Sequence, residues 1–98
     1  MVEKQPCVYI MSNQPYGTLY VGVTSNIIYR AWQHRNGQFK GFTSEFDLKL
    51  LVYYDFLASF PEAIKREKCL KKWRRTWKIE LIQSMNPLWN DLFPGLLG

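Results

Sequence analysis

Two segments near the N-terminus are rich in β-branched and aromatic residues, Cys7–Met11 and Thr18–Val23. Such segments favour β-strands, and Pro15 between them favours a turn. A short connection makes the pair antiparallel. With the turn at Pro15, we expect Tyr9 to lie directly opposite Tyr20. Both phenols would then lie on one face of the sheet, with the aliphatic side chains on the other.

A helical pattern follows the second strand. Thr24–Asn26 supplies N-cap candidates and Asn36-Gly37 supplies a stop signal, which predicts a helix between them. The helix has an apolar stripe and a separate polar stripe whose members recur every fourth residue. The apolar stripe consists of Ile27, Ile28, Ala31 and Trp32, and the polar stripe of Asn26, Arg30 and His34.

The second half of the chain predicts a loop over Gln38–Asp47, a third strand over Leu48–Phe56 and further helices. Ser59-Phe60-Pro61-Glu62 favours a helix start, and this helix is expected to run to about Trp73–Lys78. Its expected apolar stripe is Ala63, Ile64, Leu70 and Trp77, with Glu67 in the same sector. The apolar pattern of Ile79, Leu81 and Ile82 continues to Asn86-Pro87, and Leu88, Trp89 and Leu92 are expected to pack back on the core.

These elements predict a small mixed α/β (α+β) domain with a three-stranded, mainly antiparallel sheet flanked by helices. The 98 residues, of which 47% are apolar and 16% aromatic, suit one packed domain. We expect residues 6–92 to form its core. The ends, Met1–Gln5 and Pro94–Gly98, are expected to be loose because little follows the Pro-Gly pair.

The charge of the chain is positive and unevenly distributed. The net charge is +5, and eight of the thirteen Lys and Arg residues lie between Lys65 and Lys78. Such a concentration favours a polyanionic partner, although a solvated helix face would have the same composition.

The cysteines and the apolar runs exclude two classes of protein. Cys7 and Cys69 lack the spacing of a zinc site and are expected to be reduced thiols. No apolar run approaches the roughly 18 residues of a membrane helix. Because the segment before Pro6 also lacks the apolar region of a signal peptide, we expect a cytoplasmic protein without a membrane partner.

Three groups of polar residues are candidates for chemistry. Glu67 lies in an apolar sector, where it could bind a hard divalent cation or pair with Arg30, Arg66 or Lys71. Arg30 and His34 share a helix face and could contact a phosphate and accept a proton, or simply face solvent. Tyr9 and Tyr20 could line the same site or be core aromatics with hydrated hydroxyls.

The order and spacing of these residues resemble the GIY-YIG nuclease superfamily over nearly the whole chain. The resemblance is strongest to small, single-domain bacterial predicted endonucleases with a URI-type domain. It rests on the Tyr-Val-Gly-x-Thr, Arg-x-x-x-His, Ala-x-x-Arg-Glu-Lys and Asn-Pro-x-Trp-x-Asp-Leu patterns, which occupy Tyr20–Thr24, Arg30–His34, Ala63–Lys68 and Asn86–Leu92.

The resemblance implies a set of roles. Tyr9 and Tyr20 would line the scissile phosphate and the attacking water, with Tyr20 or His34 as general base. Arg30 would neutralise the phosphate, and Glu67 would hold one Mg²⁺ or Mn²⁺. Asn90 would close the site, with Asn86 as the second candidate. DNA contacts are expected at Gly22, Lys71, Arg74 and Arg75.

The chain departs from the family pattern at two positions. The first motif reads Cys7-Val8-Tyr9 in place of Gly-Ile-Tyr, so a thiol replaces a small glycine. Val23 stands where a lysine supports the tyrosine base in some relatives, including the incision subunit of nucleotide-excision repair. This second departure favours His34 over Tyr20 as the general base.

The leading interpretation is a metal-dependent endonuclease that hydrolyses phosphodiester bonds of DNA, with one metal ion per site. Its expected partner is DNA, including branched or damaged forms, with RNA left open, and its expected state is a monomer or a weak homodimer. Two alternatives remain at this point. One is a catalytically weak nucleic-acid-binding module of the same fold, and the other is a protein-interaction domain that uses the aromatic residues of segment 73–93.

Overall fold

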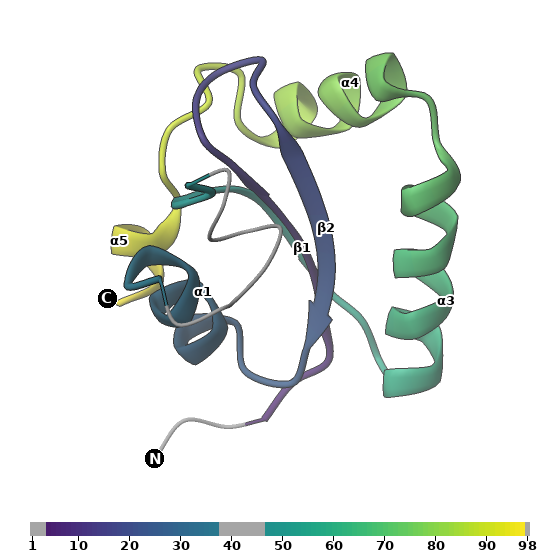
Figure 1. The fold of residues 1–98 in the computed structure, drawn as a ribbon. Helices are drawn as coiled ribbons and strands as arrows, with labels where there is room; N and C mark the ends of the chain where they lie inside the picture. The colour runs from purple at the N-terminus through teal and green to yellow at the C-terminus, as the bar shows by residue number, and fades with distance from the viewer. Residues whose placement is uncertain (1–3, 38–46, 98) are drawn as a thin grey trace.

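Three antiparallel strands form the centre of the protein. The structure, a computed structural model, describes residues 4–37 and 47–97. Strand β1 (Cys7–Ser12) lies between β2 (Leu19–Thr24) and β3 (Leu50–Phe56) and pairs with both in antiparallel orientation. The predicted fold class is therefore confirmed. In Figure 1, α1 and α5 lie on one side of the sheet and α3 on the other.

The register of the β1–β2 hairpin differs from the prediction. Tyr9 pairs with Gly22, and Tyr20 pairs with Met11, so the predicted pairing of Tyr9 with Tyr20 is wrong. The connection is as long as predicted but is shifted by one residue, to residues 13–18, and across it the side-chain oxygen of Asn13 accepts the Thr18 N–H at 3.0 Å. Each pairing partner thereby moves by two residues, an even number, which leaves every side chain on its expected face.

The first helix, α1 (Ile27–Arg35), begins and ends where the sequence predicts. The Asn26 side chain caps it by accepting the Tyr29 N–H at 3.1 Å. At the other end, Gly37 has a φ of 64°, a left-handed conformation that glycine adopts without strain. The predicted loop over Gln38–Asp47 falls on residues 38–46, which lie outside the described residues.

The predicted long helix is two helices, α3 (Phe60–Lys72) and α4 (Arg75–Met85). Ser59 caps α3 as expected, but Trp73 and Arg74 have extended backbones and break the helix. A contact just beyond the break involves residues distant in sequence, which apolar periodicity cannot reveal. The Arg75 guanidinium, just beyond it, donates to the carbonyls of Tyr16 and Gly17 at 2.6 and 2.7 Å.

Because of this break, α4 turns away from α3 and lies across the end of the sheet (Figure 1). The predicted apolar stripe fails at Ile64 and Trp77, which are exposed, while Ala63 and Leu70 are buried. The chain also ends differently from expectation, since Phe93–Leu96 form a short helix, α5, with Phe93 buried. None of the helices in the described part of the chain is long and apolar enough to cross a membrane.

The sheet separates two hydrophobic clusters. On one face, Val8, Ile10 and Val21 pack with Ala63 and Leu70 of α3. On the opposite face, a second cluster joins β1 to α1, β3 and α5. Its buried members are Cys7, Tyr9, Met11, Ile27, Ala31, Leu48, Leu51 and Phe93. Strand β2 is an edge strand between the two layers, so a site at this edge can draw residues from both.

Candidate active site

Two tyrosines and a histidine from three elements meet on the α1 side of the sheet. The Tyr9 hydroxyl lies 3.0 Å from Nε2 of His34. The Tyr9 and Tyr20 ring centroids are 6.3 Å apart, and each lies 5.6 Å from the His34 ring. The sequence predicted that both tyrosines share a face, and the family resemblance implied that His34 joins them at the phosphate. The structure brings all three together.

Gly22 provides the space for the Tyr9 ring. A Cβ atom at Gly22 would lie 2.5 Å from both Cζ and the hydroxyl oxygen of Tyr9, well inside the separation of about 3.5–4.0 Å at which carbon atoms attract. Only a residue without a side chain fits at this point of β2. The structure therefore gives Gly22 a packing role, and its predicted contact with DNA stays a prediction.

Burial sets the protonation states of the pair formed by Tyr9 and His34. Desolvation, followed by the nearby positive charge of Arg30, lowers the pKa of His34 to about 4. Desolvation raises the pKa of Tyr9, although Arg30 opposes that shift. At neutral pH the phenol is therefore protonated and the imidazole neutral, and the tautomer of His34 decides whether the Tyr9 O–H or the Nε2–H is the donor in the bond between them.

Arg30 joins this group from the same helix as His34. It is half-buried, one turn before His34, and its charge acts on both His34 and Tyr9. A guanidinium here offers a cationic fork beside two phenols and an imidazole. Cys7 adds no nucleophile on this face, because burial raises the pKa of its thiol to about 12 and keeps it protonated.

Glu67 comes from the opposite layer. It lies on α3, its side chain is 15% exposed, and its carboxylate pairs with Lys71 at 3.2 Å. Among the ion-pair alternatives, the sequence had named this lysine. Because α3 covers the face of the sheet opposite to Tyr9, the convergence of Glu67 with the other four residues across the edge of β2 stays a prediction.

The two candidate asparagines have different surroundings. Asn86 is buried, and its side chain donates to the carbonyls of Val52 at 3.1 Å and Asn90 at 2.8 Å while accepting the Asn90 N–H at 3.0 Å. These bonds tie the end of α4 to β3. Asn90 is exposed, so of the two it is the one whose side chain can meet a substrate.

An ion pair between Arg35 and Asp91 fastens α1 to the C-terminal segment. The second carboxylate oxygen of Asp91 accepts the N–H groups of Leu51 at 3.2 Å and Phe93 at 3.1 Å. Sequence reasoning missed this contact, because the partners lie far apart in the chain. It positions the helix that carries Arg30 and His34.

The predicted DNA-binding residues of the basic segment make different contacts within the protein. Lys71 pairs with Glu67, and Arg75 holds the β1–β2 connection through the two carbonyl contacts described above. Arg74 is exposed and lies over the Trp77 ring, 5.5 Å from its centroid. All three residues are exposed, and their contact with DNA stays a prediction.

The donor set limits the kind of metal that could bind. Within residues 4–37 and 47–97, no cluster of three or more His, Cys, Asp or Glu side chains could enclose an ion. A single, mostly buried carboxylate suits a cation that keeps several waters and binds the substrate phosphate, as Mg²⁺ commonly does. Glu67 fits this mode, with Lys71 as the competitor for its charge.

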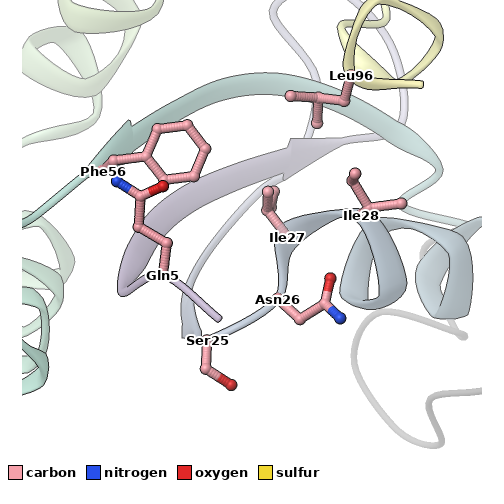
Figure 2. A pocket seen from close by; sticks show the side chains of 7 residues that line it. All are labelled: Gln5, Ser25, Asn26, Ile27, Ile28, Phe56 and Leu96. Carbon is pink, nitrogen blue, oxygen red and sulfur yellow. The ribbon is translucent and has the colours of Figure 1, made fainter. Parts of the chain in front are cut away.

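A pocket of about 230 Å³ lies beside the start of α1, away from the tyrosine–histidine group. Figure 2 shows its side chains coming from the segment before β1, from the beginning of α1, from the end of β3 and from α5. The lining residues are Gln5, Ser25, Asn26, Ile27, Ile28, Phe56 and Leu96. None of the predicted catalytic residues is among them.

Comparison with known proteins places the chain in a family. A family model described as the GIY-YIG catalytic domain matches residues 5–80. A UPF0213 protein of Clostridium perfringens is 37% identical over 67 residues, which cover 68% of this chain and 72% of that protein. UPF0213 proteins of Staphylococcus saprophyticus and Staphylococcus haemolyticus are 36% and 32% identical, covering 69% and 79% of this chain and 83% and 93% of those proteins. No solved structure matches the chain.

Proposed function

Because the chain belongs to the GIY-YIG catalytic-domain family, whose domain implies nuclease activity in general, we propose that it is a divalent-metal-dependent endonuclease that hydrolyses phosphodiester bonds of DNA. The observation that carries this proposal is the buried hydrogen bond between Tyr9 and a neutral His34, next to Tyr20 and Arg30. This group combines a proton acceptor, phenol hydroxyls and a cation for the phosphate.

Hydrolysis requires that the attacking water lose a proton. His34 is uncharged at neutral pH, because its pKa is about 4, and it would act as a weak acceptor for this proton. In the tautomer whose Nε2 accepts the Tyr9 O–H, the proton would reach His34 through Tyr9, whose hydroxyl would pass its own proton to Nε2 and take one from the water. Tyr20 is the alternative base, and its ring contacts both of these residues.

The negative charge that develops on the phosphate needs stabilisation. Arg30 would supply it from α1, where a guanidinium can bind two phosphate oxygens at once. Glu67 would hold one Mg²⁺ or Mn²⁺ from α3, after giving up its pair with Lys71. When bound, the cation would act as a Lewis acid toward the phosphate oxygens and the leaving group. Asn90, which is exposed, would close the site.

The basic segment would bind the sugar-phosphate backbone. Eight Lys and Arg residues between Lys65 and Lys78 belong to α3, to the break after it and to the start of α4. Arg74 is an exposed example. Contacts to phosphates carry affinity without sequence preference. One such site would cut one strand, and the same contacts would serve branched or damaged DNA as well as intact duplex.

The proposal is tested by incubating the purified chain with single-stranded, duplex and branched DNA, with Mg²⁺, with Mn²⁺ and with a chelator. We expect metal-dependent cleavage that Arg30→Ala and Tyr20→Phe reduce by at least about 100-fold. Gln33→Ala serves as the matched control, because it truncates a polar side chain of the same helix outside the group. DNA binding without cleavage under every metal condition would instead indicate a binding module.

A further inference from the structure

Two tryptophans form a corner where α3 ends and α4 begins (Figure 1). Trp73 caps the end of α3, and Trp77 lies in the first turn of α4. Their ring centroids are 6.0 Å apart and their ring planes are 85° apart. A flat molecule that stacks on one ring therefore presents its edge to the other. Trp77 is 47% exposed, so its ring is accessible without displacing any core residue.

A groove runs from this corner along α4. Its volume is about 450 Å³, within the range of about 300–1,000 Å³ that ligand pockets usually occupy. It is lined by Trp73, Trp77, Glu80, Leu81 and Ser84. The four members from α4 are spaced three or four residues apart, so they form one continuous stripe on the surface of this helix.

Positive charge surrounds the corner. The Arg66 guanidinium lies 5.0 Å from the centre of the Trp73 ring, and that of Arg74 lies 5.5 Å from the centre of the Trp77 ring. Segment 68–79, which contains both tryptophans, has six Lys and Arg residues and no Asp or Glu. The occupant that matches aromatic rings among cations is a polyanion that carries flat rings, which describes a nucleic acid strand.

The two ends of the groove differ in charge. Arg74 lies at the beginning of α4, whereas Glu80 and Ser84 line the groove farther along the helix. From Arg74 to Glu80 the distance along the helix axis is about 9 Å. A nucleotide has the same order of charges, because its phosphate is an anion and a base such as cytosine offers an amino group that a carboxylate accepts. This order places the phosphate at Arg74 and the base edge at Glu80.

We propose that the groove at Trp73 and Trp77 holds one unpaired nucleobase that carries an amino group, with its phosphate at Arg74. This inference rests on the proposed nuclease function and specifies a part of its substrate. None of the residues that line the groove belongs to the group around Tyr9 and His34. The bound base therefore anchors the strand and takes no part in the reaction.

The groove requires an unpaired base. Inside a duplex the faces of a base are covered by its neighbours and its amino group is bonded to the partner base. A flap, a bulge or a single strand exposes both at little unstacking cost. Bases of this kind are commonly stacked on aromatic rings or guanidinium planes and bonded along their pairing edges. We therefore expect the chain to prefer substrates with at least one unpaired nucleotide.

The test uses an oligonucleotide that carries a single cytosine and is abasic at every other position. A fully abasic oligonucleotide of the same length has the same number of phosphates, so the ratio of the two affinities isolates the base from the backbone. Binding is measured by fluorescence anisotropy in a chelator, so that cleavage does not contribute. We expect the cytosine to raise affinity by about 5- to 100-fold. Trp77→Ala should reduce this gain to less than about 2-fold.

Replacing the cytosine by uracil tests the contact with Glu80. Uracil has a ring of the same size but presents a carbonyl oxygen in place of the amino group. It should bind about 2- to 10-fold more weakly than cytosine. Glu80→Ala should abolish this difference, whereas Glu62→Ala, which removes an exposed carboxylate from α3, should leave it in place. Equal binding of cytosine and uracil by the unaltered chain would overturn the requirement for an amino group.

Controls separate this stacking from a general effect of aromatic surface. Trp32→Ala removes a comparably exposed tryptophan, 42% exposed, from α1 on the other side of the sheet (Figure 1), and should leave the gain from cytosine unchanged. Trp77→Phe keeps a ring and should retain most of that gain. A duplex with one bulged cytosine should bind more tightly than the same duplex with the cytosine paired.

Three results would overturn the stacking site. The first is equal affinity for the single-cytosine and abasic oligonucleotides, and the second is a gain that survives Trp77→Ala. The third is tighter binding of the fully paired duplex, because α4 would then contact a duplex groove. Loss of self-association in Trp77→Ala, with the gain from cytosine unchanged, belongs to the second case and would show that a second copy covers the groove.

The failure of this inference is distinguishable from the failure of the proposed function. Metal-dependent cleavage without a gain from the single cytosine would remove the stacking site and leave the nuclease. A gain that depends on Trp77, without cleavage in any metal, would support the stacking site and remove the nuclease. No binding to any oligonucleotide would overturn both.

Discussion

Replacing Gly22 by alanine tests how the Tyr9 ring is held over β2. The new Cβ would lie 2.5 Å from Cζ and the hydroxyl oxygen of Tyr9 and 2.8 Å from Cε1. The ring must then retreat by about 1 Å to reach an ordinary carbon contact. Tyr9 has no exposed surface to retreat into, and its movement would break the 3.0 Å bond to His34.

The size of the effect follows from three contributions. Overpacking of a buried site costs about 1–3 kcal/mol, and the lost hydrogen bond about 0.5–1.5 kcal/mol. Alanine recovers about 0.5–1 kcal/mol relative to glycine within a strand. We expect Gly22→Ala to lower the free energy of unfolding by about 2 kcal/mol, within a span of about 0.5–4 kcal/mol, and a loss of about 2 kcal/mol in a domain of this size lowers Tm by about 8–16 °C. Cleavage should fall as well.

A double-mutant cycle isolates the contact. Tyr9→Leu removes the two ring carbons and the hydroxyl oxygen that a Gly22 Cβ would meet, so adding Gly22→Ala in that background should cost nothing or stabilise slightly. Gly95→Ala is the matched control, because its Cβ would meet nothing within 4 Å. The measurement is urea unfolding of the four chains of the cycle. If Gly22→Ala is as stable as the unaltered chain, or costs the same with Leu at position 9, the reasoning is refuted.

Three further results are expected. The folded-state pKa of His34, about 4, lies below the ordinary value of 6.5. The free energy of unfolding should therefore be highest above pH 6.5 and fall by up to about 3 kcal/mol as the pH drops toward 4. Urea unfolding of His34→Gln should lack this pH dependence. Asn86→Ala should lower the free energy of unfolding by about 2–4 kcal/mol by removing three hydrogen bonds, whereas Asn90→Ala should change it by less than about 0.5 kcal/mol and reduce cleavage. DNA affinity should fall with salt at a log–log slope of about −0.9 per phosphate contact, and Lys71→Ala and Arg74→Ala should each reduce that slope by about one; a flat salt dependence would leave the solvated-helix interpretation.

Local patterns predicted most of the fold. The caps at Asn26 and Ser59 and the glycine at position 37 act within a few residues, so the sequence specifies where α1 starts and ends and where α3 starts. The faces of the strands were also predictable, because side chains alternate with a period of two. These features place Tyr9, Tyr20 and His34 together.

The errors lie where turn composition and apolar periodicity carry no information. The hairpin connection contains a bond from the Thr18 N–H to the Asn13 side chain, and turn composition alone does not specify that bond. The break between α3 and α4 coincides with the contact of Arg75 with Tyr16 and Gly17, residues distant in sequence. Apolar periodicity continues through the break, and therefore could not reveal it.

The features of the candidate site also divide into those that local spacing predicts and those that require the folded structure. The Arg30–His34 spacing predicted a shared helix face, but the hydrogen bond of His34 to Tyr9 requires the folded sheet. Glu67 was expected to be buried, and its side chain is indeed mostly covered, yet its partner Lys71 lies one turn along the same helix. From the sequence, Arg30, Arg66 and Lys71 were all possible partners of Glu67. Only the folded structure shows that the partner is Lys71.

The metal site at Glu67 is tested most directly by the rate of metal-dependent nicking by Glu67→Gln, measured together with the Tm of this variant. The change keeps the shape of the side chain and removes the charge that a hard cation needs. Losing a partly exposed i, i+4 pair with Lys71 costs only about 0.3–0.5 kcal/mol, so Tm should change little. Glu62→Gln removes an exposed carboxylate from the same helix and serves as the control. We expect nicking to fall by orders of magnitude in Glu67→Gln, with DNA binding retained, and to stay unchanged in Glu62→Gln. Nicking at the unaltered rate in Glu67→Gln would contradict a metal site at this residue and the mechanism built on it.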